Sequence, residues 1–293
     1  MEDSAPVWQL IVSGLSLGSI YSLVALGMVL GFKTTRVMNF AHGDLVMLAA
    51  FLAWWLIEIR GVSFWLAAVL VAVAIGFINK GIESRVVRRA GKGGRHATVL
   101  ATIGIGVLIR GAVALVFGPE SRSYPTPWTG QTTRIGSVVV ADLHLVILVS
   151  TLVFTSALYA FLQWTRPGLA LRAGSHNASA ARLMGIDVPR HNAWAWAACG
   201  VLAAVCGLLL APITLVDISL WQVVLKALAT VVVGGFGNIA GALVGGLVLG
   251  LVEQFSGVYL PDGWKDMIPY AVIVAALLLR PLGLLGEKSS ARV

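Results

Sequence analysis

Residues 8–31 read WQLIVSGLSLGSIYSLVALGMVLG, and this stretch decides the fold class of the whole chain. Its 24 residues include no Asp, Glu, Lys or Arg. A helix needs about 20 mostly apolar residues to cross a bilayer, so the stretch predicts a membrane-spanning helix. Glu2 and Asp3 precede it without a basic residue, which argues against a signal peptide. We therefore expect this span to be retained.

The composition extends this conclusion to most of the chain. Of 293 residues, 58% are hydrophobic and only 12% are charged. Soluble domains carry about 25% charged residues, so these charges are too few to cover a globular surface in water. A soluble enzyme, a disordered tail and a disulfide-built secreted module are thereby excluded. Cys199 and Cys206 are about 10 Å apart along a helix, beyond the reach of a disulfide, and are expected to be buried thiols.

Further apolar stretches follow the first one and predict an all-α, polytopic bundle that forms a single domain over residues 1–293. After 8–31, we expect spans at 39–58, 63–82, 97–117, 143–164, 191–213, 219–236, 240–258 and 266–280. The glycine-bearing pair within 219–258 has the weakest pattern, so the prediction is eight or nine transmembrane helices.

The positive charges predict the orientation in the membrane. Fifteen of the 21 Lys and Arg residues fall in four clusters between apolar stretches. The clusters are Lys33 and Arg36; Lys80, Arg85, Arg88, Arg89, Lys92 and Arg95; Arg166, Arg172, Arg182 and Arg190; and Arg280, Lys288 and Arg292. Aromatic residues do not alternate with them, as a nucleic-acid-binding groove would require. Basic residues favour cytoplasmic loops, so we expect the N-terminus outside and the C-terminus in the cytoplasm.

Two further patterns concern packing and the outer surface. Gly14 and Gly18 lie four residues apart in the first span, as do Gly237, Gly241 and Gly245 near the end of the chain. Small residues at this spacing let helix backbones approach closely in lipid, so these glycines are expected at helix contacts. The longest outer loop, 118–142, is rich in Pro and β-branched residues and predicts a small hairpin or flap.

The sequence contains no recognisable catalytic machinery. It has no GxxxxGK[S/T] phosphate-binding loop, no zinc-type histidine spacing and no GxSxG nucleophile motif. We therefore predict that the protein is not an enzyme and binds no metal or cofactor of its own. Any ATP that drives it must be bound by another chain.

Polar residues inside the membrane are costly and mark candidate sites. Asn39, Phe40, His42, Gly43 and Asp44 open the second span. One interpretation is an ordinary helix start, with Asn39 as the N-cap. The other is a broken helix whose exposed backbone and polar side chains face a substrate path.

Three isolated charges in apolar stretches, Arg110, Lys226 and Glu253, allow two interpretations. They extend to the membrane surface, or they pair inside the bundle. The sequence does not identify the partners.

The basic segment of about 166–190 has a distinct pattern. Residues 177–184 predict a short helix with an apolar side, and Gly185 fits the left-handed position that ends a helix. Such a helix lies on the membrane surface or docks in a groove of a partner protein.

Five ordered motifs resemble the permease subunits of bacterial branched-chain amino acid ABC importers. They are GSIYSLVALGM (18–28), MNFAHGD (38–44), AARLMGIDV (180–188), VGGFGNIAGA (233–242) and RPLGLLG (280–286). The resemblance covers about residues 8–286. The Asn-Phe-Ala-His-Gly string is typical of the first of the two permease types that pair in these systems.

The resemblance implies a type II importer-like bundle in a bacterial cytoplasmic membrane. It also implies a second permease, related or identical, two ATP-binding subunits that hold ATP and Mg²⁺, and an extracytoplasmic solute-binding protein. The broken-helix string 39–44 would lie near the substrate path. The basic segment would be the coupling loop that docks in the ATPases. The coupling residues so implied are Arg172, Asn177, Ala181, Arg182, Leu183, Met184 and Gly185.

The resemblance leaves the solute open among branched-chain amino acids, urea, short amides and other small molecules. Asp44 stands where many relatives have Glu, and the chain is unusually rich in Trp. The leading prediction is a permease that alternates its access to the two sides as partner ATPases hydrolyse ATP. The alternative is an ion-coupled secondary transporter, which would need paired intramembrane acids.

Overall fold

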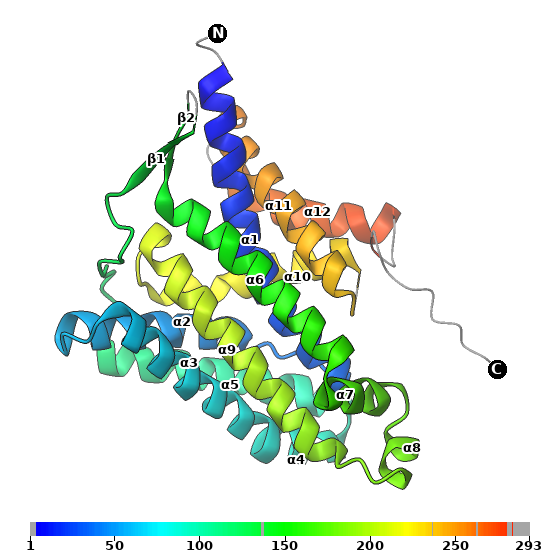
Figure 1. Cartoon of the computed structure of the whole chain (residues 1–293). Coiled ribbons are helices and arrows are strands. Elements are labelled where there is room, and N and C mark those ends of the chain that lie inside the picture. Colours follow the sequence, from blue (N-terminus) through cyan, green and yellow to red (C-terminus); the bar gives the residue numbers. More distant parts are fainter. Residues whose placement is uncertain (1–3, 136–137, 236, 262, 280–282, 284–293) are drawn as a thin grey trace.

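A computed structural model describes residues 4–135, 138–235, 237–261, 263–279 and 283 (Figure 1). The predicted basic cluster at Arg280, Lys288 and Arg292 lies outside these residues, as does most of the motif at 280–286. The elements in chain order are α1 (Ser4–Thr35), α2 (His42–Trp54), α3 (Phe64–Gly81), α4 (Arg88–Ala90), α5 (Arg95–Phe117), β1 (Thr132–Ile135), β2 (Val138–Ala141), α6 (Asp142–Trp164), α7 (Arg166–His176), α8 (Ala178–Leu183), α9 (Val188–Thr214), α10 (Val223–Gly234), α11 (Ile239–Tyr259) and α12 (Trp264–Leu279). Short helical turns η1 (Trp55–Ile59), η2 (Ile82–Val87), η3 (Gly91–Gly93) and η4 (Ile218–Gln222) link some of them.

The predicted all-α membrane bundle is confirmed. Within the described residues, seven helical stretches are long and apolar enough to cross a bilayer. They are Val7–Thr35, His42–Ile59, Phe64–Gly93, Arg95–Phe117, Asp142–Trp164, Val188–Thr214 and Ile239–Tyr259. Two shorter apolar helices lie at Ile218–Gly234 and Met267–Leu279. Each predicted span coincides with one of these stretches.

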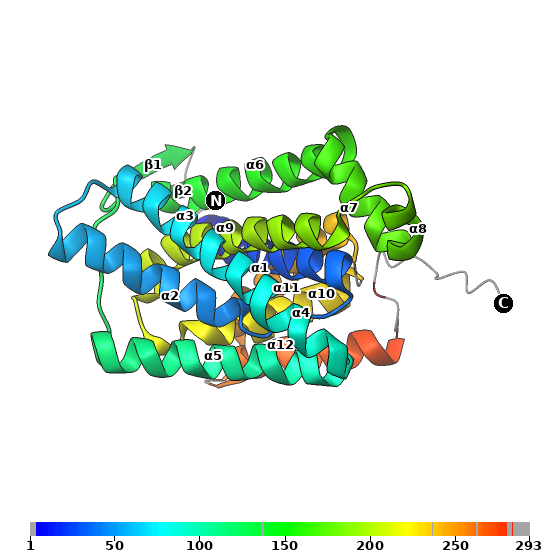
Figure 2. The ribbon, with the colours of Figure 1, turned by 90° about the horizontal axis from the view of Figure 1, so that it is seen from below.

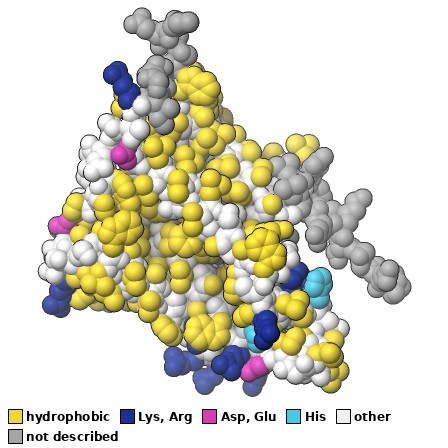
Figure 3. Space-filling model, in the orientation of Figure 1, with side chains coloured by type: hydrophobic (Ala, Val, Ile, Leu, Met, Phe, Trp, Pro, Cys, Tyr) yellow, Lys and Arg dark blue, Asp and Glu magenta, His cyan; other side chains and the backbone are white. Residues whose placement is uncertain are grey.

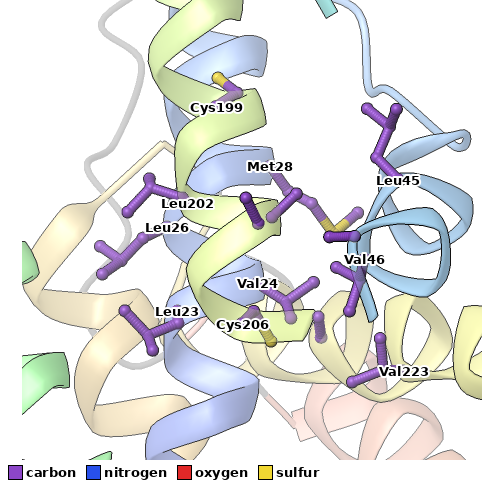
Figure 4. Packing of buried hydrophobic residues seen from close by; sticks show 14 of the residues in the cluster. Leu23, Val24, Leu26, Met28, Leu45, Val46, Cys199, Leu202, Cys206 and Val223 are labelled. Atoms are coloured by element: carbon purple, nitrogen blue, oxygen red, sulfur yellow. The ribbon is translucent and has the colours of Figure 1, made fainter. Parts of the chain in front are cut away.

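Helix α1 is the centre of the bundle, and α6, α9, α10 and α11 pack around it. Within their most apolar windows, 83% of α1 is buried inside the protein but only 17% of α5. Figure 4 shows Val24 and Met28 of α1 among side chains of α2, α9 and α10. Seen from below in Figure 2, α5 lies along one edge of the molecule. Helix α1 is therefore the buried core, and α5 is peripheral.

Glycines let α11 approach its neighbours. A Cβ atom added to Gly18 of α1 would lie 2.5 Å from the carbonyl oxygen of Gly246, and one added to Gly245 would lie 2.5 Å from that of Thr230. Added to Gly14, it would lie 3.1 Å from the Leu251 backbone. These positions have no room for a side chain.

Gly241 and Gly237 differ from each other. Gly241 lies directly against the Gly234 backbone of α10. Gly237 was predicted on the same stripe, but it lies before α11 begins at Ile239 and has a φ of +81°. It belongs to the turn that enters α11, since Asn238 caps this helix by accepting a hydrogen bond from the Gly241 amide.

The second predicted span is broken at its start. Helix α1 ends at Thr35, residues 36–41 are not helical, and α2 then runs for only 13 residues. The η1 turn continues α2 without a gap, and together they form the stretch His42–Ile59, which is long enough to cross the membrane. A non-helical break therefore precedes α2, whereas its place beside a substrate path stays a prediction.

Two smaller predictions also match. Strands β1 and β2 pair antiparallel, with Thr132 opposite Ala141, and form the hairpin expected within 118–142. Cys199 and Cys206 are free, buried thiols. On the face drawn in Figure 3, most Lys and Arg side chains gather at the end formed by α4, α7 and α8, while the N-terminus lies at the opposite end.

Candidate functional site

Asn39 holds the break between α1 and α2 to two other helices. Its side-chain oxygen accepts a hydrogen bond from the Ala41 amide at 3.1 Å, and its Nδ2 donates to Oδ1 of Asn79 at 3.2 Å. Asn79 in turn donates to the carbonyl oxygen of Trp196 in α9 at 2.6 Å. The N-cap position of α2 is Ala41, without a side-chain capping bond. Asn39 is therefore not the N-cap of α2: its side-chain oxygen binds within the turn that precedes the helix, and its Nδ2 binds across the bundle.

Asp44 forms an ion pair with Arg110 of α5. Both Nε and Nη2 of Arg110 lie 3.0 Å from Oδ1 of Asp44. The Asp44 side chain is 3% exposed and that of Arg110 is 29% exposed. The guanidinium carbon also lies 3.6 Å from the centre of the Trp221 ring in η4, within the range of a cation–π contact. A carboxylate, a guanidinium and an aromatic face thus meet where the first turn of α2 faces α5 and η4.

Glycines allow this cluster to form. A Cβ atom at Gly106 of α5 would overlap the Asp44 carboxylate, and one at Gly43 would overlap the Trp221 carbonyl oxygen. Gly43 therefore permits the start of α2 to touch η4, and Gly106 permits Asp44 to reach α5.

His42 and Phe40 complete the predicted string. His42 is fully buried, and neither ring nitrogen has a hydrogen-bond partner. Its ring lies against Gly27 of α1, where a Cβ atom would overlap it. The backbone amide of Phe40 donates to the Thr102 hydroxyl of α5 at 3.4 Å. The predicted residues 39–44 thus contact α1, α3, α5 and η4 at one place.

The sequence did not identify Arg110 and Trp221 as members of this site. Arg110 is the only charged residue of α5 beyond its first residue, Arg95. That isolation was the available signal, but its partner lies 66 residues away in the chain.

A second intramembrane ion pair joins α10 to α11. Lys226 Nζ lies 2.6 Å from Oε1 of Glu253, and the Tyr21 hydroxyl of α1 donates to Oε2 of Glu253 at 2.9 Å. The Glu253 side chain is 1% exposed. Pairing inside the bundle, rather than extension to the membrane surface, is therefore the arrangement of all three isolated charges.

The segment 166–190 forms two short helices, α7 and α8. Asn177 caps α8 by accepting hydrogen bonds from the amides of Ser179 and Ala180, and Gly185 follows with a φ of +83°. The residues of the predicted apolar side differ in their exposure within this chain, and their docking on a partner stays a prediction. Ala181 is buried, whereas Leu183 and Met184 are 89% and 83% exposed.

The two Arg residues predicted in this segment have different surroundings. Arg182 is exposed beside Leu183. Arg172 donates to Oε1 of Gln163 at 2.8 Å and is half-buried. Leu183, Met184 and Arg182 therefore present an exposed apolar and basic surface at the end of the molecule that α7 and α8 form (Figure 1).

Among the described residues, no group of three His, Cys, Asp or Glu side chains is placed to hold a metal ion. The polar cluster around Asp44 instead combines paired charges with an aromatic face, and it follows the non-helical residues 36–41.

Comparisons with known proteins agree on one family. The family model described as "Branched-chain amino acid transport system / permease component" matches residues 10–277. The high-affinity branched-chain amino acid transport system permease protein LivH of Salmonella typhimurium is 29% identical, with 97% of each chain covered. BraD of Pseudomonas aeruginosa, described in the same terms, is also 29% identical over 97% of each chain.

One solved structure shares the fold. It is PsaBC from Streptococcus pneumoniae in complex with Fab, with a TM-score of 0.51, 12% sequence identity and 95% of each chain covered.

Proposed function

Because the chain belongs to the permease family of branched-chain amino acid transport systems, we propose that it carries branched-chain amino acids or a related small solute through the membrane, driven by ATP. It is a multi-pass protein of the cytoplasmic membrane. In this proposal the N-terminus lies outside and the C-terminus inside, as the gathering of basic side chains at the opposite end supports (Figure 3).

The observation that carries this proposal is the Asp44–Arg110 pair beside a broken helix. A zwitterionic amino acid presents a carboxylate and an ammonium group. Arg110, which is 29% exposed, offers a cation to the carboxylate, and Asp44 offers an anion to the ammonium. Residues 39–44 then form part of the path, with unwound backbone facing the solute.

In this proposal, other chains bind and hydrolyse the ATP. The proposed complex contains a second permease, related or identical, two ATP-binding subunits that hold ATP and Mg²⁺, and an external solute-binding protein. The segment α7–α8 docks in the ATP-binding subunits through Leu183, Met184 and Arg182, which are exposed. Hydrophobic side chains that project so far into water favour a protein contact.

An ion-coupled secondary transporter is less well supported. It would need an intramembrane acid that gains and loses a proton or a cation. Asp44 and Glu253 each have a basic partner at 3.0 Å or closer, so a coupling ion would have to displace that partner.

Reconstitution in proteoliposomes tests the proposal. The chain is assembled with its partner subunits and binding protein, and uptake of labelled leucine, urea and acetamide is measured with ATP and with a non-hydrolysable analogue. Leucine uptake that requires ATP hydrolysis and survives an ionophore supports the proposal. Uptake that depends on an ion gradient and not on ATP contradicts it.

A further inference from the structure

A groove opens between two membrane-spanning helices on the outside of the bundle. Helices α6 and α11 both pack on α1, and a groove of about 620 Å³ lies between them. Its walls are almost entirely apolar and include Ala157 and Ala160 of α6 and Ala240 and Leu243 of α11. Both helices are long enough to cross the membrane, so the groove lies between two candidate spans.

The groove continues into a basic pocket. A second cavity of about 370 Å³ shares Tyr159, Ile239 and Ala240 with the groove. The basic residues among the described residues that line it are Lys33, Arg36, Arg172 and His176, and no Asp or Glu is among them. Figure 3 shows Lys, Arg and His side chains at this end of the molecule, beside an apolar surface.

The basic side chains are held in place by the protein. Arg36 donates to the carbonyl oxygen of Ser175 at 2.9 Å. Arg172 is fixed through Nη1 to Oε1 of Gln163 at 2.8 Å, while its buried Nε has no hydrogen-bond partner. The pocket therefore presents a positioned guanidinium with an unsatisfied donor, which favours an anion.

Aromatic residues mark the depth of the site. Trp164 and Tyr159 line the groove near the end of α6, and they are 82% and 51% exposed. Trp and Tyr are enriched where a membrane meets water. The basic pocket thus lies at the level of the lipid headgroups, and the groove extends from it toward the hydrocarbon.

We propose that this continuous groove and pocket bind an anionic phospholipid of the cytoplasmic leaflet, with an acyl chain between α6 and α11 and the phosphate among Lys33, Arg36, Arg172 and His176. Basic pockets between transmembrane helices recognise acidic headgroups in this way. A soluble partner protein would account for the basic pocket but not for an apolar groove at membrane depth.

Native mass spectrometry of the full-length chain tests the headgroup half of the site. The protein is titrated with phosphatidylglycerol and with phosphatidylethanolamine of the same acyl chains. We expect tighter retention of phosphatidylglycerol, and about fivefold weaker retention for each charge removed in Lys33→Gln and Arg172→Gln. Lys92→Gln is the matched control, because Lys92 is an exposed base in the η3 turn and does not line the pocket. Equal retention of both lipids by the native chain overturns the proposal.

Filling the groove tests the acyl-chain half. Ala240→Trp places a large side chain in the groove and should lower retention of phosphatidylglycerol at least tenfold. Val149→Trp is its control, because Val149 is 60% exposed on α6 and does not line the groove. If Ala240→Trp binds as the native chain does while Lys33→Gln does not, the pocket holds a phosphate-sized anion alone and the lipid site is refuted. Complete displacement of the lipid by the ATP-binding subunits would likewise refute it, because the pocket would then be a protein contact.

Discussion

Removal of one member of the Asp44–Arg110 pair should have very different effects depending on which member is removed. Arg110→Leu leaves a carboxylate that is 3% exposed without its cation, whereas Asp44→Asn leaves a guanidinium that is 29% exposed and still lies 3.6 Å from the Trp221 ring. Loss of one partner of a buried pair costs about 3–5 kcal/mol. We expect Arg110→Leu to approach this value and Asp44→Asn to cost about half of it, since Arg110 keeps contact with Trp221 and with solvent.

The double variant Asp44→Asn, Arg110→Leu separates pairing from function. It removes both charges of this pair together, so its stability should recover to within about 1 kcal/mol of the native protein. Its uptake of leucine should stay low if the pair contacts the solute. The difference between the double variant and the sum of the single variants measures the coupling of the pair.

Thermal denaturation of the purified chain, followed by Trp fluorescence, gives the stability order, and proteoliposome uptake gives the activity. The matched control is Lys226→Leu, which breaks the other intramembrane pair, that of α10 with α11, and should also destabilise the chain. The reasoning fails if Arg110→Leu is no worse than Asp44→Asn. The path assignment fails if the double variant transports at the native rate.

Three further changes test other parts of the structure. Gly241→Leu should prevent assembly because Gly241 lies against the Gly234 backbone, whereas Gly104→Leu should not, because nothing lies within 4 Å of a Cβ atom there; size-exclusion chromatography compares the two, and a monodisperse Gly241→Leu protein would contradict the packing. Gly185→Val should lower the transport obtained per ATP because Gly185 has a φ of +83°. Gly185→Asn should retain it, because Asn tolerates this conformation. Equal transport per ATP in both variants would argue against a role for the turn that ends α8. Hydrogen bonds from Ser219 and from the Ser121 hydroxyl lower the pKa of Asp217 below its ordinary value of 3.8, so the stability from this group is complete above that value and is lost as the pH falls through the lowered pKa. As the pH falls from 6 to 2, the melting temperature should therefore fall less steeply in Asp217→Asn than in the native chain. Parallel curves would contradict a contribution of Asp217 to stability.

The spans and the break could be predicted from the sequence because both depend on local patterns. A run such as 8–31 must be helical and buried in lipid whatever it contacts, since its backbone has no other way to satisfy its hydrogen bonds there. The position of Gly185 after a short helix is a local signal of the same kind, and the structure places it with a positive φ.

The partners in the ion pairs and the buried faces of the short helices could not be predicted from the sequence, because they depend on how elements distant in the chain pack together. Lys226 and Glu253 are 27 residues apart, and nothing in either stretch indicates the other. In α8, six residues are too few for a periodic pattern to identify the buried face, so Ala181 could not be separated from Leu183. Gly237 has the same four-residue spacing in a turn as it would have in a helix, and only the cap at Asn238 distinguishes the two.

The two intramembrane ion pairs are related through the two short helices of the bundle. Helix α2 has 13 residues and continues into η1, and α10 has 12 residues and follows η4. Each carries one charge in its first turns, Asp44 in α2 and Lys226 in α10, and each charge pairs with a longer helix, α5 or α11.

The starts of these short helices also touch, because Gly43 lies against Trp221 and Val224. A movement of α2 relative to α5, or of α10 relative to α11, would separate a pair, and buried charges resist separation because each would be left without a partner. The pairs thus favour movement of α2 with α5, and of α10 with α11, as two units that meet at Gly43.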